Sequence, residues 1–235
     1  MSTILHIETS TDICSVCLAR EGEIISIKET DIERSHAGIL TVFISEIMEE
    51  SMQRRQKLDA IAVSMGPGSY TGLRIGVSVA KGICYGADLP LISVPTLEAM
   101  CIGALRKFSQ DIEKNGLLIP MIDARRMEVY MAIYDTGMNL IEKTSATVIN
   151  ENTFRKHLGA HRIFLFGTGA VKLKNWFNHE NICFLEDFKI SSRYMVDIAL
   201  QRFKLNRFED VAYFEPYYLK DFIATTPKKN QLFRS

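Results

Sequence analysis

The first half of the chain alternates short runs of apolar positions with longer segments that have helical spacing. Residues 3–9, 13–19 and 22–29 alternate apolar and polar side chains, which predicts three strands joined by tight turns. A candidate N-cap at Ser35 precedes apolar positions at helical spacing through Glu50. Strands are predicted near residues 58–63 and 90–94, each followed by a helix, over residues 72–86 and 96–108. This order predicts a mixed sheet flanked by helices.

The pattern restarts after Asn115 and Gly116. Residues 117–123, 127–135 and 140–149 form another series of three predicted strands, followed by a helix near 151–157, a strand at 162–167 and helices near 170–177 and 192–203. The repeated order predicts a duplicated α/β fold with an N-terminal lobe, residues 1–115, and a smaller C-terminal lobe, residues 116–235. The aromatic segment from Asn206 is expected to pack back before a frayed end.

The stretch MGPGSYTGLRIG, residues 65–76, joins a predicted strand to a helix and is rich in glycine, as phosphate-binding turns are. It matches neither common template. Counted from Gly66, Gly72 comes one place late for a P-loop, and Leu73 stands where that motif needs lysine. The same shift breaks the dinucleotide-binding spacing, and Pro67 removes a backbone N–H. The spacing therefore favours a tight strand-to-helix turn.

The helix after this turn carries Gly72, Gly76 and Ala80 at every fourth position, and such a stripe lets another helix approach closely. The other sides of this helix are also largely apolar, and so is most of the helix over residues 35–50. In both helices the apolar surface is wider than the ~100° stripe that a single core contact requires. Either the two helices are sandwiched within their own lobe, or they form a protein–protein surface. The candidate interface residues are Ile39, Phe43, Ile47, Gly72, Gly76, Val77, Ala80 and Ile83.

Composition narrows the choice of partners and compartment. The chain has 235 residues, with 28 Lys and Arg against 28 Asp and Glu, so no global field attracts nucleic acid. The first residues lack the basic start and cleavage site of a secretory signal, and the longest uncharged run is shorter than the ~18 residues of a membrane span. Five scattered cysteines indicate a reducing compartment. We expect a cytoplasmic protein without a membrane segment.

Signals for metal binding are weak. Cys14 and Cys17 have a ligand spacing, but a strand places residues three apart on opposite faces. His157 and His161 are four apart in a segment that favours a solvated loop. Glu8 and Asp123 end the first strand of each lobe, and in a duplicated fold such acids converge on the interlobe cleft, where a carboxylate binds Mg²⁺. Two acids that simply face solvent fit the pattern equally well.

Several longer segments together resemble one family. ILHIETSTDICSVCLA (residues 4–19), MGPGSYTGLRIGVSVAKGI (65–83), VPTLEAM (94–100) and DARRMEVYMAIYD (123–135) are similar to the bacterial TsaB (YeaZ) proteins, with weaker similarity in FGTGA (166–170) and EPYYLKDF (215–222). The resemblance implies a two-lobed, duplicated RNase H-like fold of the acetate/sugar kinase–Hsp70–actin type, each lobe a mixed sheet flanked by helices. It also implies a role in making threonylcarbamoyladenosine (t6A), the modification beside the tRNA anticodon.

In that family the chemistry belongs to a related partner, TsaD, and an ATPase called TsaE completes the assembly, while TsaB is the scaffold and activator. The partner family binds its metal through a His-x-x-x-His pair, which aligns with Thr96 and Met100 of this chain. A lone hydroxyl and a thioether make a poor site for a hard metal. The resemblance therefore implies no catalytic residue and no metal site in this chain.

The nucleotide cleft of the fold is also altered. The sequence DARR places Ala124, Arg125 and Arg126 in a turn where nucleotide-binding members need glycine. Glu8 stands where kinases of the fold have Asp, and Asp123 begins the altered turn. Gly167 and Gly169, in the segment GTGA, keep the look of an adenosine loop. We expect a degenerate cleft with weak or no nucleotide binding, so that ATP and a metal are used by the complex through its partners.

The leading hypothesis is a pseudoenzyme subunit that docks the helices at residues 35–50 and 72–86 on TsaD, and on a second copy of itself as a homodimer when TsaD is absent. Gly76→Arg is then predicted to abolish partner binding without unfolding the monomer. The alternative is a stand-alone, ATP-dependent kinase-like or carbamoyl-transferring enzyme. In a third hypothesis the C-terminal tail binds tRNA directly instead of being a solvated terminus, through the basic residues Lys220, Lys228, Lys229 and Arg234.

Overall fold

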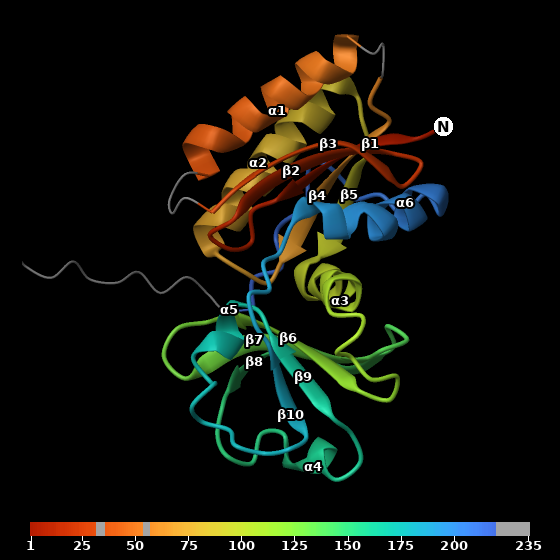
Figure 1. Cartoon of the computed structure of the whole chain (residues 1–235). Helices are drawn as coiled ribbons and strands as arrows, with labels where there is room; N and C mark the ends of the chain where they lie inside the picture. The colour runs from red at the N-terminus through yellow and green to blue at the C-terminus, as the bar shows by residue number, and fades with distance from the viewer. Residues whose placement is uncertain (32–35, 54–56, 220–235) are drawn as a thin grey trace, which may run out of the picture.

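The structure is a computed structural model that describes residues 1–31, 36–53 and 57–219. The proposed N-cap Ser35 and the basic residues of the tail lie outside these ranges. The chain forms two lobes, each built on a five-stranded mixed sheet (Figure 1). Over the residues that the structure describes, no helix combines the length and the apolar composition needed to cross a membrane.

The first sheet has the order β3-β2-β1-β4-β5. Its strands are β1 (Thr3–Glu8), β2 (Cys14–Arg20), β3 (Glu23–Thr30), β4 (Ala60–Gly66) and β5 (Leu91–Pro95). Strands β1 to β3 are antiparallel, whereas β4 and β5 run parallel to β1 because helices connect them. Helices α1 (His36–Gln53) and α2 (Tyr70–Ala87) cover one face of this sheet, as Figure 1 shows.

The second sheet repeats this topology with the order β8-β7-β6-β9-β10. Its strands are β6 (Leu117–Asp123), β7 (Glu128–Asp135), β8 (Leu140–Val148), β9 (Ile163–Phe166) and β10 (Ile182–Leu185). In each sheet the first strand pairs antiparallel with the second strand and parallel with the fourth. The matching order and strand directions confirm the duplicated, RNase H-like architecture predicted from the restarting pattern.

The second lobe has much less helix than the sequence pattern predicts. The helix expected near residues 151–157 is the single turn α4 (Arg155–Leu158), and the one expected near 170–177 is the short α5 (Thr168–Val171). Strand β10, which the pattern did not indicate, forms the sheet edge next to β9. Its four residues, ICFL, are apolar, but so short a run does not by itself indicate a strand.

Helix α3 (Thr96–Lys107) lies between the two lobes (Figure 1). On one side Leu97, Met100 and Cys101 are buried against the second sheet, among side chains such as Phe164 and Phe166. On its other side Ala99 joins the core of the first sheet, which also includes buried residues of β4 and β5. A helix that is apolar on both sides therefore connects the two cores.

The chain returns to the first lobe after β10, which corrects the predicted lobe boundary at its C-terminal end. The short helix η1 (Ser192–Met195) and α6 (Val196–Lys204) lie on the face of the first sheet opposite α1 and α2. Met195, Ile198 and Ala199 are buried there against β1, β4 and β5. The chain passes from α3 to β6 between residues 107 and 117, and residues 192–204 pack on the first sheet.

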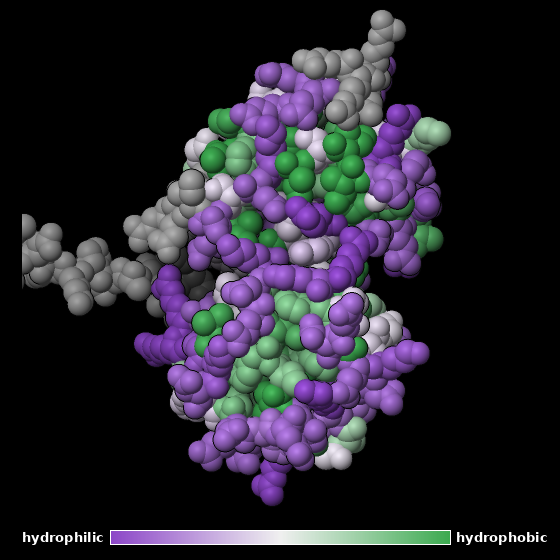
Figure 2. Space-filling view, viewed as in Figure 1, coloured by the Kyte–Doolittle hydropathy of each residue, from purple (hydrophilic) through white to green (hydrophobic). Residues whose placement is uncertain are grey.

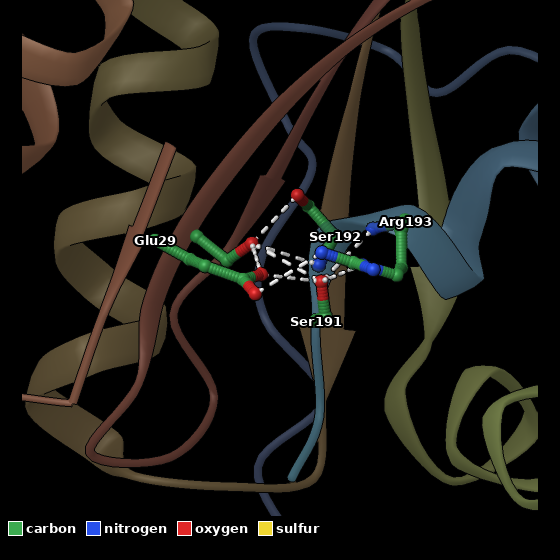
Figure 3. A network of polar contacts seen from close by, with 5 residues as sticks. Glu29, Ser191, Ser192 and Arg193 are labelled. Carbon is green, nitrogen blue, oxygen red and sulfur yellow. Dashed lines mark hydrogen bonds and ion pairs between the residues drawn. The ribbon is translucent and has the colours of Figure 1, made fainter. Parts of the chain in front are cut away.

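A polar network fixes η1 to the first sheet (Figure 3). The hydroxyl oxygens of Ser15 and Ser192 are 2.7 Å apart, and the Ser191 hydroxyl donates to the Glu29 carboxylate at 2.7 Å. Arg193 adds an ion pair to the other oxygen of Glu29 at 3.2 Å. Ser15, Ser191 and Ser192 are buried, so the contact between the Ser15 and Ser192 hydroxyls is protected from water, whereas the Glu29–Arg193 ion pair is partly exposed.

The segment that follows α6 runs along the first lobe, as the aromatic pattern from Asn206 predicts. The Glu209 N–H donates to the Leu91 carbonyl at 2.8 Å, and the Tyr217 N–H donates to the Met65 carbonyl at 2.7 Å. The Lys81 ammonium on α2 donates to the carbonyl oxygens of residues 212 and 214. These contacts place residues 209–217 against β4, β5 and α2.

Candidate functional site

The glycine-rich turn and the start of α2 are closed off by the loop that follows β1. The Ser69 N–H donates to the Ser10 carbonyl at 2.7 Å, and the Ser69 hydroxyl caps α2 by accepting the Gly72 N–H at 3.2 Å. A Cβ on Gly68 would collide with the Ser10 carbonyl, and one on Gly72 with the Thr9 carbonyl. The glycines therefore let two backbone segments of the same lobe meet, which confirms a tight strand-to-helix turn.

Glu8 ends β1 in a fully buried position beneath this loop. Its Oε1 accepts the Ser10 N–H at 2.6 Å. The other carboxylate oxygen of Glu8, Oε2, is buried and has no hydrogen-bond partner among the described residues. The same is true of the neighbouring hydroxyl oxygens of Thr9 and Ser10. Burial raises the pKa of the Glu8 carboxyl, which favours its neutral form. The sequence left two interpretations of Glu8 open: a metal-binding acid in the interlobe cleft, or an acid that faces solvent. The structure supports neither, because the Glu8 side chain is fully buried and does not line the interlobe cavity.

Asp123, at the corresponding end of β6, is half exposed and paired within the chain. The Lys172 ammonium next to α5 forms an ion pair with its carboxylate. The same ammonium donates to the Arg126 carbonyl at 2.8 Å and to the Glu128 carbonyl at 2.6 Å. The Lys172 ammonium therefore contacts the carboxylate and carbonyl oxygens that a bound Mg²⁺ ion would need as ligands.

Gly167 and Gly169 serve close packing of α5 on the second sheet. Gly167 has φ +92° and a Cβ there would collide with the Met121 carbonyl and the Met100 side chain. A Cβ on Gly169 would lie 2.9 Å from Met121 Cβ and Val129 Cγ1. The glycines of GTGA are therefore required by the fold, whether or not an adenosine binds beside them.

A cavity of about 380 Å³ lies between the lobes. Thr11, Asp12 and Ile13 line it from the first lobe, and Gly167 and Thr168 are among the residues that line it from the second. Neither Glu8 nor Asp123 is among its lining residues, so the structure does not bring the two candidate acids together in one open site.

The positions aligned with the partner family's histidines have packing roles. The Thr96 hydroxyl accepts the Gly66 N–H at 3.1 Å, and Met100 is buried between the lobes. Nowhere in the described chain do three or more His, Cys, Asp or Glu side chains form a group that fits a metal ion. As predicted, Cys14 and Cys17 lie in different cores on opposite faces of β2.

The small-residue stripe on α2 faces the interior, and this corrects the predicted docking surface. Gly72, Gly76 and Ala80 are buried, and a Cβ on Gly76 would collide with the Thr9 hydroxyl. Val77 of α2 and Ile47 of α1 are also core residues. These five candidates contact their own lobe. Gly76→Arg would disrupt the fold and is not a test of partner binding.

The three remaining candidates, Ile39, Phe43 and Ile83, are half-buried. Near them on α1, Val42 is 46% exposed. The outer side of α2 carries a different small-residue stripe, Ser78, Gly82 and Gly86, which is exposed, and a Cβ on either glycine would meet open space. We use the name outer α1–α2 face for the partly or fully exposed residues of this set on both helices: Ile39, Val42, Phe43, Ser78, Gly82, Ile83 and Gly86. Ile39 and Phe43 lie on the flank of α1 toward β3, where Glu46 and Glu50 pair with Lys28. Figure 2 shows apolar patches on the upper lobe within a mostly hydrophilic surface.

Sequence reasoning missed Lys172 and the stripe at Ser78, Gly82 and Gly86. The stripe has the same spacing as the buried one, so a signal for it existed in the sequence. Lys172 carries no motif, because its partners lie more than forty residues away along the chain.

Comparison with known proteins places the chain in a family. A family model described as "TsaD: tRNA N6-adenosine threonylcarbamoyltransferase" matches residues 24–192. The tRNA threonylcarbamoyladenosine biosynthesis protein TsaB of Escherichia coli K12 is 33% identical over 231 residues, 94% of this chain and 96% of that protein. TsaB of Haemophilus influenzae is 31% identical over 232 residues, with 93% and 94% covered.

A solved structure extends the likeness to three dimensions. YeaZ from Pseudomonas aeruginosa superposes with a TM-score of 0.79 at 25% identity, and the match covers 93% of this chain and 100% of that one. The likeness runs through both lobes and confirms the two-lobed fold expected from the sequence. The chain therefore belongs to the TsaB (YeaZ) family of tRNA threonylcarbamoyladenosine biosynthesis proteins.

Proposed function

We propose that this chain is a non-catalytic scaffold and activator subunit that acts with TsaD and TsaE in threonylcarbamoyl transfer to the tRNA adenosine beside the anticodon. The names of its relatives and the matching TsaD-type family model support this pathway. In this proposal the chain meets tRNA only indirectly, through its partners, and works in the cytoplasm.

The engagement of the candidate acids and of the glycine-rich turn with other groups of the chain is the observation that carries the non-catalytic assignment. The carbonyls of Thr9 and Ser10 fill the space over the glycine-rich turn, and Lys172 occupies the oxygen ligands around Asp123. Glu8 is buried with a raised pKa. Phosphoryl transfer needs metal ions and donors that face the substrate. In this chain the corresponding groups are engaged with one another.

The outer α1–α2 face is the proposed docking site for TsaD, and for a second copy of the chain when TsaD is absent. It combines half-buried Ile39, Phe43 and Ile83 with exposed Val42. Gly82 leaves room for the close approach of a partner helix. Apolar and aromatic side chains are enriched in the buried cores of protein interfaces.

The test compares two glycine-to-arginine variants. Gly82 lies on the outer α1–α2 face, and Gly159 lies on the second lobe next to α4; a Cβ on either meets open space. We expect Gly82→Arg to weaken TsaD binding by about 2 kcal/mol or more, roughly thirtyfold in Kd, because a bulky charge then sits within the interface. Gly159→Arg serves as the control and is expected to bind normally. Calorimetry with purified TsaD gives both values, and wild-type affinity of Gly82→Arg would rule out this face.

The enzyme alternative is tested separately. We expect t6A formation by TsaD and TsaE to depend on this chain, and we expect the isolated chain with ATP and Mg²⁺ to show no turnover. Hydrolysis or transfer by the isolated chain would replace the scaffold proposal with the stand-alone enzyme.

A further inference from the structure

The interlobe cavity has a wall that is mainly apolar. Its volume of about 380 Å³ lies in the range of cavities that enclose a ligand. Val171 of α5 lines the cavity and is 75% exposed, so it presents apolar surface to whatever enters. Such a wall favours an apolar occupant. Apolar residues that line it from the second lobe and from the segment after β10 include Leu165, Phe184, Phe188 and Ile190.

The charged side chains at the cavity include acids that lack a partner. The two lysines that line it, Lys174 and Lys189, are each paired with a carboxylate. Asp12 and Asp187 also line the cavity and are exposed, and within the described ranges neither carboxylate forms an ion pair. The occupant that complements this cavity is therefore apolar and has positive charges beside its apolar part.

The described part of the chain ends at Leu219, which is connected to this cavity through one turn and one loop. The ring of Tyr218 lies 4.8 Å from the ring of Tyr70 at the start of α2. The residue before Tyr70 donates its N–H to the Ser10 carbonyl, and the next residues of that loop, 11–13, line the cavity. The rest of the chain therefore begins near the first-lobe wall of the cavity.

Residues 220–235, the C-terminal tail, have the composition that the cavity requires. A fully extended chain of this length spans about 50 Å, more than the ~30 Å diameter of a small domain, so its end can reach the cavity. The tail carries four bases and one acid, and it ends in KKNQLFRS. Leu232 and Phe233 thus stand between basic residues. This arrangement is complementary to an apolar cavity that has free carboxylates at its side.

We propose that the C-terminal tail is an internal ligand of the interlobe cavity. Leu232 and Phe233 enter the cavity, and the neighbouring bases pair with Asp12 and Asp187. Because both lobes line the cavity, the bound tail bridges them and keeps other ligands out. The covalent connection holds the tail at a high effective concentration, which favours it over a separate peptide of the same composition.

The experiment measures trypsin cleavage of the full-length chain after Lys228 and Lys229, followed by mass spectrometry. Cleavage of a docked tail requires that it leave the cavity first, so the rate reports the population of the free tail. A synthetic peptide of residues 220–235 gives the rate for an undocked tail, and a peptide with the matching substitutions serves each tail variant. Protection is the ratio of the peptide rate to the chain rate.

Two pairs of variants locate the contact. In the tail, Leu232→Ala/Phe233→Ala removes the apolar pair, and Asn230→Ala/Gln231→Ala is the matched control. In the second lobe, Val171→Gln removes apolar surface at the cavity. Val148→Gln is its control, at a 64% exposed position of β8 that does not line the cavity. Thermal unfolding checks that all variants are folded.

We expect the wild-type tail to be protected at least about tenfold. Leu232→Ala/Phe233→Ala should lower this protection at least about fivefold and Val171→Gln at least about threefold, while both controls stay within about twofold of wild type. In spectra of isoleucine methyl groups, the signals of Ile13 and Ile190 should move in the variant that lacks the apolar pair, because both residues line the cavity.

Three results overturn the proposal. The first is cleavage of the wild-type chain at the rate of the free peptide. The second is protection that does not depend on Leu232 and Phe233, or that depends on them while Val171→Gln and the two isoleucine signals show no effect. The third is protection that falls on dilution, which means that the tail binds a second copy of the chain. The assay contains neither TsaD nor TsaE, so its outcome is independent of the scaffold role.

Discussion

Gly72 and Gly82 lie on the same helix, α2, and have opposite surroundings. A Cβ on Gly72 would collide with the buried Thr9 carbonyl, whereas a Cβ on Gly82 would meet nothing within contact distance. We expect Gly72→Ala to destabilise the protein by about 1–3 kcal/mol, because the backbone of the β1 loop has to move. Gly82→Ala should stabilise it by about 0.5–1 kcal/mol, because alanine favours a helix.

Urea unfolding of the two variants measures both free energies. The pair is a matched control, since each change adds one methyl group to the same helix. Equal stability of Gly72→Ala and wild type would mean that the close contact between α2 and the β1 loop is not tight in solution.

His6 is a fully buried residue of β1, and its neutral ring donates from Nδ1 to the Cys17 carbonyl at 3.2 Å. Burial lowers the pKa of His6 to about 4. The unfolded chain therefore takes up a proton at higher pH than the folded one, and stability falls as pH drops below the unfolded pKa. His6 alone should cost about 2 kcal/mol between pH 7 and pH 5.

The measurement compares His6→Gln with wild type, because Glu8 acts in the opposite sense. The raised pKa of Glu8 contributes stability at low pH that is lost as pH rises. The difference between the two unfolding curves isolates His6: it should be flat near pH 8 and should narrow by about 2 kcal/mol toward pH 5. Parallel curves across this range would show that His6 does not titrate on unfolding.

Helix α2 shows which parts of an element the sequence can predict. Its position was predicted within a few residues, since the glycine-rich turn and the apolar repeat mark both ends. The prediction that Gly72, Gly76 and Ala80 face a partner was wrong, because all three are buried in the first lobe. A helix that is apolar nearly all round has no polar face to indicate its orientation, and two small-residue stripes of equal spacing compete. Tertiary contacts decide between them: Gly72 and Gly76 lie against Thr9, and Ala80 packs in the core of the first lobe.

The second lobe shows the limit for short elements. A helix of one turn, such as α4 or α5, is held by its surroundings and has little propensity signal of its own. Strand β10 depends on pairing with β9, which is distant in sequence. The site has the same limitation: Asp123 was predicted from its strand end, but its partner Lys172 is fixed only by tertiary structure.

At the scale of the whole molecule, the lobes are less independent than a division at residue 115 indicates. The first sheet has α1 and α2 on one face, and its other face is covered by α3, η1 and α6. Two of these covering elements come from the end of the chain, beyond the entire second sheet. The polar network of Glu29 with Ser191 and Arg193 ties the same segment to β3. The first core is thus completed only after the second lobe has been crossed.

Because η1 and α6 complete the first core, a fragment that lacks them is expected not to fold. Residues 1–115 alone leave the apolar side chains Ile4, Ile92 and Val94 without the cover of Met195 and neighbouring residues of α6. We expect this fragment to bind a hydrophobic dye and to lack a cooperative urea transition, because uncovering a sheet face exposes more apolar surface than the stability of a domain can offset. Co-expression with residues 116–235 supplies η1 and α6 and should restore a folded complex, which is the control. A fragment 1–115 that unfolds cooperatively by itself would instead establish the first lobe as an independent domain.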